Sequence, residues 1–130
     1  MASWEDVRRL ALALPETDEH PSYGRAPSWR VKGKSFVWER PLRQKEAAEL
    51  GDRQPQGPVL GVSVTDLGVK QALLAEEPGV CFTISHFDGY PAVLVRLDEI
   101  DVPELEELIT DAWLAKAPKR LAAAHLTDSA

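Results

Sequence analysis

The chain has 130 residues, of which 44% are hydrophobic and 28% are charged, as is typical of a soluble globular domain. It contains no apolar run of about 18 residues, which excludes a membrane-spanning helix, and its N-terminus lacks the features of a signal peptide. The single cysteine, Cys81, excludes an internal disulfide, and its apolar surroundings predict an inert core thiol. We therefore expect one cytoplasmic domain, residues 1–130, without membrane contact.

The net charge of −6 conceals an uneven distribution of charged residues. Residues 1–65 carry ten basic and nine acidic side chains, a net charge of +1, whereas residues 66–130 carry five and twelve, a net charge of −7. Within Arg25–Lys45, seven basic side chains are opposed only by Glu39, a net charge of +6. Local potential rather than net charge steers a polyanion, so this segment is a candidate surface for nucleic acid.

The first predicted element is a helix that begins after Ser3 and ends before Pro15. Ser3 and Asp6 have the spacing of a capping box, in which each side chain bonds to the backbone of the other residue. Apolar residues recur behind them at helical spacing: Val7, Leu10, Ala11 and Leu14. The following segment, 16–27, is rich in turn-forming residues, and we expect a short strand near Ser22–Tyr23.

Residues 28–40 have the pattern of a β-hairpin. Gly33-Lys34 suits a two-residue type II′ turn, which has glycine at its first central position. The resulting register places the large apolar side chains on one face: Trp29, Val31, Phe36 and Trp38. Arg30 and Lys32 would then point to solvent from the other face.

The middle of the chain predicts a long connection and then regular structure. Residues 41–58 form an irregular excursion that contains a short helix at Lys45–Leu50. A strand at Val59–Val64 and a helix at Asp66–Ala75 follow. The apolar residues expected to face inward from that helix are Val69, Ala72 and Leu73.

The last third of the chain predicts a second hairpin, Cys81–Leu97, which turns at Asp88–Gly89. A helix then begins at Asp101, with Glu104 as its reciprocal cap. Its core stripe consists of Leu105, Leu108, Ile109, Ala112 and Trp113. Pro118 is well placed to begin a final helix, Pro118–His125. Two hairpins accompanied by helices predict a compact α+β domain, with helices packed against an antiparallel sheet.

These residues resemble the MmcQ/YjbR-like family of bacterial proteins, which are often labelled DNA-binding. The resembling segments are Leu12–Pro15, Ser22–Gly24, Trp29–Lys34, Lys70, Phe82–Thr83, His86–Leu97, Asp111–Trp113 and Ala117–Leu121. The resemblance implies a compact α+β domain and, for some members, a double-wing mode of binding DNA, in which the hairpins 28–40 and 81–97 would be the wings. The second wing departs from this mode, because its tip carries no Lys or Arg.

The leading functional hypothesis is non-specific binding of duplex DNA by the basic hairpin and the residues that follow it. Such contacts would be made mainly to phosphates, with little sequence preference and a steep dependence on salt. The candidate residues are Arg25, Arg30, Lys32, Lys34, Arg40, Arg43 and Lys45. The same pattern also fits a solvated sheet face whose cations keep an edge strand soluble.

The alternative hypothesis is a non-catalytic module that binds a small ligand or a protein at the aromatic turn around His86. Ligand sites combine apolar walls with a few polar anchors. The candidate residues are Tyr23, His86, Tyr90 and Arg96. Turn chemistry and packing at the end of the sheet would explain the same residues without a ligand.

The sequence indicates no catalytic residue, metal or cofactor. Ser85, His86 and Asp88 are the residue types of a catalytic triad, but neighbours on a strand point to opposite faces and cannot easily share a proton. The histidines are scattered, without the spacing of metal ligands: His20, His86 and His125. The sequence does not establish the oligomeric state, and a monomer is compatible with it.

Overall fold

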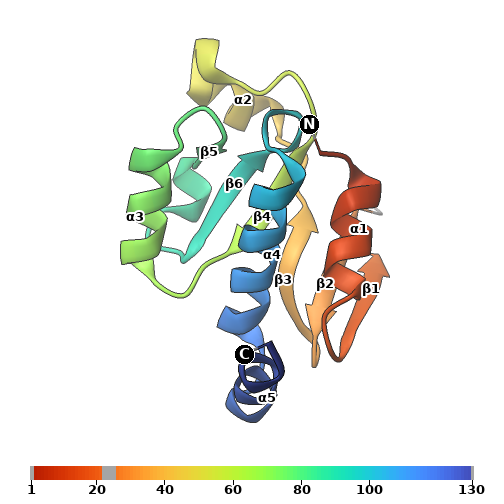
Figure 1. Ribbon diagram of the computed structural model, residues 1–130. Helices are drawn as coiled ribbons and strands as arrows, with labels where there is room; N and C mark the ends of the chain where they lie inside the picture. Colours follow the sequence, from red (N-terminus) through yellow and green to blue (C-terminus); the bar gives the residue numbers. More distant parts are fainter. Residues whose placement is uncertain (1, 22–25, 130) are drawn as a thin grey trace.

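The computed structural model describes residues 2–21 and 26–129 (Figure 1). Its strands form one antiparallel sheet of six strands in the order β1-β2-β3-β4-β6-β5. Their bounds are Thr17–Pro21 (β1), Pro27–Val31 (β2), Lys34–Glu39 (β3), Val59–Ser63 (β4), Cys81–Phe82 (β5) and Ala92–Arg96 (β6). The predicted α+β architecture, an antiparallel sheet with helices packed against it, is confirmed.

The helices are α1 (Trp4–Leu12), α2 (Gln44–Leu50), α3 (Leu67–Glu76), α4 (Val102–Lys116) and α5 (Lys119–Ser129). Helices α1 and α4 lie over one face of the sheet, which we call the helix face, and α3 lies beside the edge formed by β6 and β5 (Figure 1). Helix α2 lies behind the sheet at one end of the opposite face, which we call the second face (Figure 1). None of the described helices has the length and apolar character that crossing a membrane requires.

The helix face carries the larger core. The predicted capping box of α1 is present, since Ser3 N donates to Asp6 Oδ2 over 2.9 Å and Asp6 N donates to Ser3 Oγ over 3.4 Å. The predicted stripe of α4 is fully inside this core, and Asp101 caps that helix by accepting from Glu104 N over 2.8 Å. These local signals depend only on neighbouring residues, which is why the sequence pattern predicts them well.

The first hairpin differs from the predicted register. Lys32 and Gly33 are the two turn residues, and both have positive φ angles, 50° and 82°, as a type I′ turn requires. Trp29 pairs with Val37 and Arg30 with Ser35, so that Phe36 is left without a partner in a β-bulge. The bulge lets Phe36 and Val37 both enter the core of the helix face.

The second hairpin is also looser than predicted. Strands β5 and β6 pair Cys81 with Val95 and Phe82 with Leu94, and residues 83–91 between them form a longer loop than predicted, with a short 3-10 turn at Ser85–Phe87. The predicted turn at Asp88–Gly89 is present within this loop, where Tyr90 N donates to Phe87 O over 3.0 Å and Gly89 has a positive φ of 74°. We call residues 83–91 the site loop. Cys81 is buried, and this burial, with the charges of Glu104 and Glu77, raises the pKa of its thiol to about 12.

Helix α3 matches the predicted inward face only at Leu73, which packs against the core of the helix face. Its buried residue is Lys70, whereas Val69 and Ala72 are exposed and Leu73 is half-buried. The periodicity rule treats lysine as a surface residue, but the amine of Lys70 donates to the carbonyls of the site loop and can therefore be buried.

Other boundaries shift by a few residues. The strand near segment 16–27 is Thr17–Pro21, and the predicted position Ser22–Tyr23 lies outside the described residues. The final helix extends beyond its predicted end at His125. The excursion 41–58 holds α2 and a 3-10 turn at Gly51–Arg53, and returns to the sheet at β4.

Candidate ligand-binding site

The structure divides the basic segment between the two ends of the β2–β3 hairpin. Lys32 and Lys34 lie at the turn, and Arg40 follows the last residue of β3. At about 3.3 Å per residue, the two ends are roughly 20 Å apart. Arg43 is the N-cap residue of α2, Lys45 lies in the first turn of that helix, and Arg25 lies outside the described residues. Five of the six described cations of this segment therefore form two groups instead of one continuous ribbon, and the sixth, Arg30, lies half-buried on β2 opposite Ser35.

Carboxylates engage some of these cations. Lys32 Nζ lies 3.4 Å from Glu16 Oε2 in an exposed pair. Arg40 forms a bidentate pair with Glu46, at 3.0 Å from Nη1 to Oε1 and 2.7 Å from Nη2 to Oε2, and both side chains are largely buried. Within the described part of the chain, no carboxylate pairs with three exposed cations: Lys34, Arg43 and Lys45.

The Arg40–Glu46 pair organises the start of α2. Glu46 Oε1 also accepts the backbone N–H of Arg43 over 2.9 Å, which fixes the first turn of the helix. Burial acts to raise the pKa of Glu46, but the hydrogen bonds from Arg40 and from the Arg43 backbone outweigh it and hold the pKa below its ordinary value. Glu46 is therefore an ionised structural group, and Arg43 projects from a fixed backbone.

Trp38 and Arg30 project from the second face of the sheet. Ser28 lies directly opposite Trp38, and Arg30 is two residues further along the same strand, so all three share a face. The Trp38 indole crosses over Gly61 of β4, where a Cβ atom would overlap the ring. Glycine at this position is what allows the indole to lie flat across the sheet.

An aromatic cluster continues from Trp38 into the site loop. The ring centroids of Trp38 and Phe87 are 6.5 Å apart, and His86 meets Phe87 edge to face at 4.9 Å. Tyr90 lies 6.1 Å from Phe87 between centroids, and the guanidinium carbon of Arg40 lies 5.5 Å from the centre of the Phe87 ring. Phe87 is thus the buried centre of the cluster, with a cation on its ring.

A hollow of about 510 Å³ opens beside this cluster. We call it the His86 hollow. Its described lining residues are Ala26, Trp38, Glu39, Arg40, Pro41, Leu42, Arg43, His86 and Phe87. A smaller hollow of about 240 Å³, which Lys45 and Ser85 help to line, shares Arg43 and His86 with it. Exposed cationic and imidazole groups therefore lie beside aromatic walls.

Two contacts hold the site loop in place. Glu49 of α2 accepts from Ser85, over 2.8 Å from the backbone N–H and 2.7 Å from the hydroxyl. Lys70 Nζ donates to the carbonyls of Phe87, at 2.6 Å, and Tyr90, at 2.9 Å. Burial lowers the pKa of Lys70, and the nearby charge of Asp88 partly opposes this effect. The hydroxyl of Ser85 is thus committed to a carboxylate, which gives no support to a catalytic arrangement with His86.

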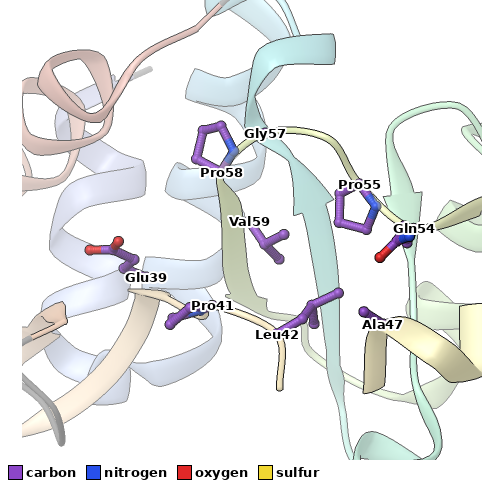
Figure 2. Close-up of a pocket in the computed structure, with 9 residues that line it drawn as sticks. All are labelled: Glu39, Pro41, Leu42, Ala47, Gln54, Pro55, Gly57, Pro58 and Val59. Carbon is purple, nitrogen blue, oxygen red and sulfur yellow. The ribbon is translucent and has the colours of Figure 1, made fainter. Parts of the chain in front are cut away.

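A further hollow of about 310 Å³ lies under the excursion. Figure 2 shows Pro58 and Val59 at the start of β4, Pro55 on the returning segment and Ala47 on α2 around it. Glu39, Pro41 and Leu42 line this hollow as well as the His86 hollow, so the two hollows adjoin at these residues. Its described lining carries no cation, which makes it less suitable for a charged ligand.

The structure combines parts of the two predicted sites. Arg40, Arg43 and Lys45 from the basic set lie near His86 and Tyr90 from the aromatic set. Arg96 has a different role, since it lies over the Phe82 ring at 4.6 Å and donates to Arg53 O over 2.6 Å, which holds the excursion to β6. Tyr23 lies outside the described residues.

One member of the site, Trp38, is predicted from the sequence only as a packing residue of the first hairpin. The predicted register places Trp38 on the face of Trp29 and Val31, whereas the bulge at Phe36 moves it to the other face. No bulge signal is visible in the sequence. The one available clue is the glycine in the middle of a strand, Gly61, which indicates close approach by another group.

Comparison with known proteins identifies the family. The YjbR family model matches residues 12–115. The chain belongs to the YjbR family. This confirms the resemblance seen in the sequence, and an uncharacterized protein of Mycobacterium bovis and one of Mycobacterium tuberculosis are each 54% identical over 132 residues, covering 99% of both chains.

A solved structure shares the fold of this YjbR-family chain. It is the crystal structure of a Deinococcus radiodurans protein with the family-model domain DUF419. The two structures superpose with a TM-score of 0.66 at 19% sequence identity, over 98% of this chain and 88% of the other. At that identity the likeness supports the α+β fold and carries no statement about a ligand.

Proposed function

We propose that this YjbR-family chain is a non-catalytic binding protein whose His86 hollow takes an anion that carries an aromatic ring, such as a nucleotide. The observation that carries the proposal is the presence of Arg43 and His86 at a hollow walled by Trp38 and Phe87. Aromatic walls favour stacking of a planar ring, and an arginine favours a phosphate or carboxylate.

The size and charge of the hollow support this ligand class. Its volume of about 510 Å³ falls within the range of small-molecule sites. The carboxylates of Glu46 and Glu49 are engaged by Arg40 and Ser85, whereas Arg43 acts on Glu46 only through its charge and forms no ion pair in the described part of the chain. Arg43 is therefore available to an incoming anion. Glu39 also lines the hollow, so Glu39→Gln should strengthen anion binding.

The experiment is isothermal titration at low salt with three probes: adenosine 5′-monophosphate, adenosine and ribose 5-phosphate. Because ring and phosphate contacts act together, the nucleotide should bind at least about tenfold more tightly than either fragment. Arg43→Ser should weaken the nucleotide by about tenfold and leave adenosine unchanged, whereas Trp38→Leu should weaken both.

Lys34→Ser is the matched control, because it removes an exposed cation at the other end of the hairpin. It should leave all three affinities unchanged. The proposal is overturned if the nucleotide binds no better than its fragments, or if Arg43→Ser and Lys34→Ser behave alike. Arg43 is exposed, so its removal keeps the test valid even if Trp38→Leu fails to fold.

Binding of duplex DNA by the first hairpin is the second candidate. Lys34 is exposed at the turn, and the exposed Lys32–Glu16 pair is expected to be weak, so both lysines are available to phosphates. Fluorescence anisotropy with a labelled duplex at low salt should then show micromolar binding that falls steeply with salt. Lys32→Glu with Lys34→Glu should abolish that binding. Unchanged binding in this double variant would rule out the hairpin as the DNA contact.

A further inference from the structure

A separate cleft lies on the helix face, between α3 and α4 at the end of β4. Its volume is about 330 Å³. Six of its lining side chains are apolar: Val62, Val64, Val69, Leu73, Leu108 and Leu114. Val62 and Val64 also belong to the core of the helix face, so the sheet separates this cleft from the His86 hollow.

The cleft is open because α3 buries the Lys70 side chain against the site loop. Lys70 reaches the carbonyls of the site loop, which leaves the neighbouring Val69 39% exposed and Leu73 only half-buried. An apolar wall that is partly exposed to water gains stability when an apolar ligand covers it. The cleft therefore has a surface suited to a hydrocarbon group.

Asp111 is the single ionisable residue in the described lining of this cleft. It lies on α4, is exposed, and pairs with no basic group in the described part of the chain. Desolvation by the surrounding walls raises the pKa of Asp111, and the charge of Glu107 adds to this effect. A carboxylate in this situation is stabilised by a cation that enters with its own apolar surface.

We propose that the cleft between α3 and α4 binds a small amphipathic cation, whose apolar body covers Val69 and Leu73 and whose protonated amine bonds to Asp111. The negative charge of Asp111 favours an amphipathic cation over an acid or an alcohol with the same hydrocarbon chain. An acid would meet the carboxylates of Asp111 and Glu107, and a neutral alcohol would gain the apolar contact without the ion pair. The cleft shares no described lining residue with the His86 hollow, so its ligand is independent of the function of that hollow.

The test is titration of the full chain at pH 7 with octylammonium, octanol and octanoate, each below its micelle concentration. The three probes share one hydrocarbon chain and differ only in the head group. Octylammonium should bind about tenfold more tightly than octanol, and octanoate should bind most weakly. Val69→Gln should weaken all three probes, because it places a polar group on the apolar wall.

Asp111→Asn should remove the preference for octylammonium over octanol and leave octanol binding unchanged. Glu106→Gln is the matched control, because Glu106 is an exposed acid on the same helix that does not line the cleft. It should retain the full preference. The proposal fails if octylammonium binds no better than octanol in the unaltered chain. It also fails if Glu106→Gln lowers the preference as much as Asp111→Asn, since the attraction would then come from the acidic surface in general.

Discussion

At the scale of single residues, buried charges organise both sides of the candidate site. Glu46 is ionised inside the structure and holds Arg40 and the first turn of α2, and Lys70 holds the site loop through its carbonyls. Each of these groups is stabilised by partners that are distant in the sequence or that a residue-type pattern does not reveal. Substitution of Glu46 or Lys70 should therefore affect the structure more than substitution of a charged residue on the surface.

Glu46→Gln should destabilise the fold by about 3 kcal/mol, because it leaves the largely buried guanidinium of Arg40 without its anion. The folded-state pKa of Glu46 lies below its ordinary value, so its stabilising contribution is complete above the unfolded pKa and is lost as pH falls through the folded pKa. Urea unfolding of both proteins at a series of pH values should show the difference shrinking toward acid. A constant difference, or one no larger than that of the exposed Glu76→Gln, would contradict this account.

Lys70→Met should loosen the site loop more than it weakens the whole fold. The substitution keeps an apolar stem in place but removes two charge-assisted hydrogen bonds, worth roughly 2 kcal/mol together after the desolvation of the amine is subtracted. Hydrogen exchange of the Tyr90 and Ala92 amides should accelerate by about 30-fold. Gln71→Met, at an exposed position on the same helix, should leave those rates unchanged. Equal rates in the two variants would show that Lys70 does not hold the loop.

At the scale of elements, a sequence pattern predicts an element well when the residues that form the pattern are near neighbours in the chain. The α1 capping box and the α4 stripe involve residues within a few positions of one another, and both are confirmed. The predicted hairpin register was wrong because the bulge at Phe36 depends on how two side chains share the distant core. That single residue decides the face of Trp38, and with it the composition of the candidate site.

Gly61→Ala should disturb the site from a neighbouring strand. An added methyl group would overlap the Trp38 indole, which must then leave its place across β4. We expect a loss of about 1–3 kcal/mol in stability, as is usual when a packed position is overfilled, and a change in Trp38 fluorescence. Gly79→Ala is the control, because no atom lies within 4 Å of the Cβ position there. An equally small effect of both substitutions would show that Trp38 does not lie over Gly61.

At the scale of the whole molecule, the sheet separates two candidate surfaces of opposite character. The second face carries the His86 hollow with its exposed cations, and the helix face carries an apolar cleft with one acid. Three residues of the described lining of the first surface, Arg40, Arg43 and His86, are predicted from the sequence, but as parts of two different sites. These residues meet because the strand order brings the site loop next to the end of β3. No short sequence motif encodes that strand order.

The two surfaces should act independently, because they share no described lining residue and lie on opposite faces of the sheet. Arg43→Ser should leave octylammonium binding unchanged, and Asp111→Asn should leave nucleotide binding unchanged, each within about twofold. The double variant should show both losses together. A larger cross-effect, measured by titration of either ligand, would indicate that the surfaces are coupled.

The location of nucleotide binding tests the central claim most directly. A ¹H–¹⁵N chemical-shift titration with adenosine 5′-monophosphate reports every backbone amide and the Trp38 indole at once. We expect the largest shifts at the Trp38 indole, at Arg43 and at His86, with none at the hairpin turn around Lys34. Shifts centred on that turn or on the α3–α4 cleft, or no shifts at millimolar nucleotide, would contradict the account.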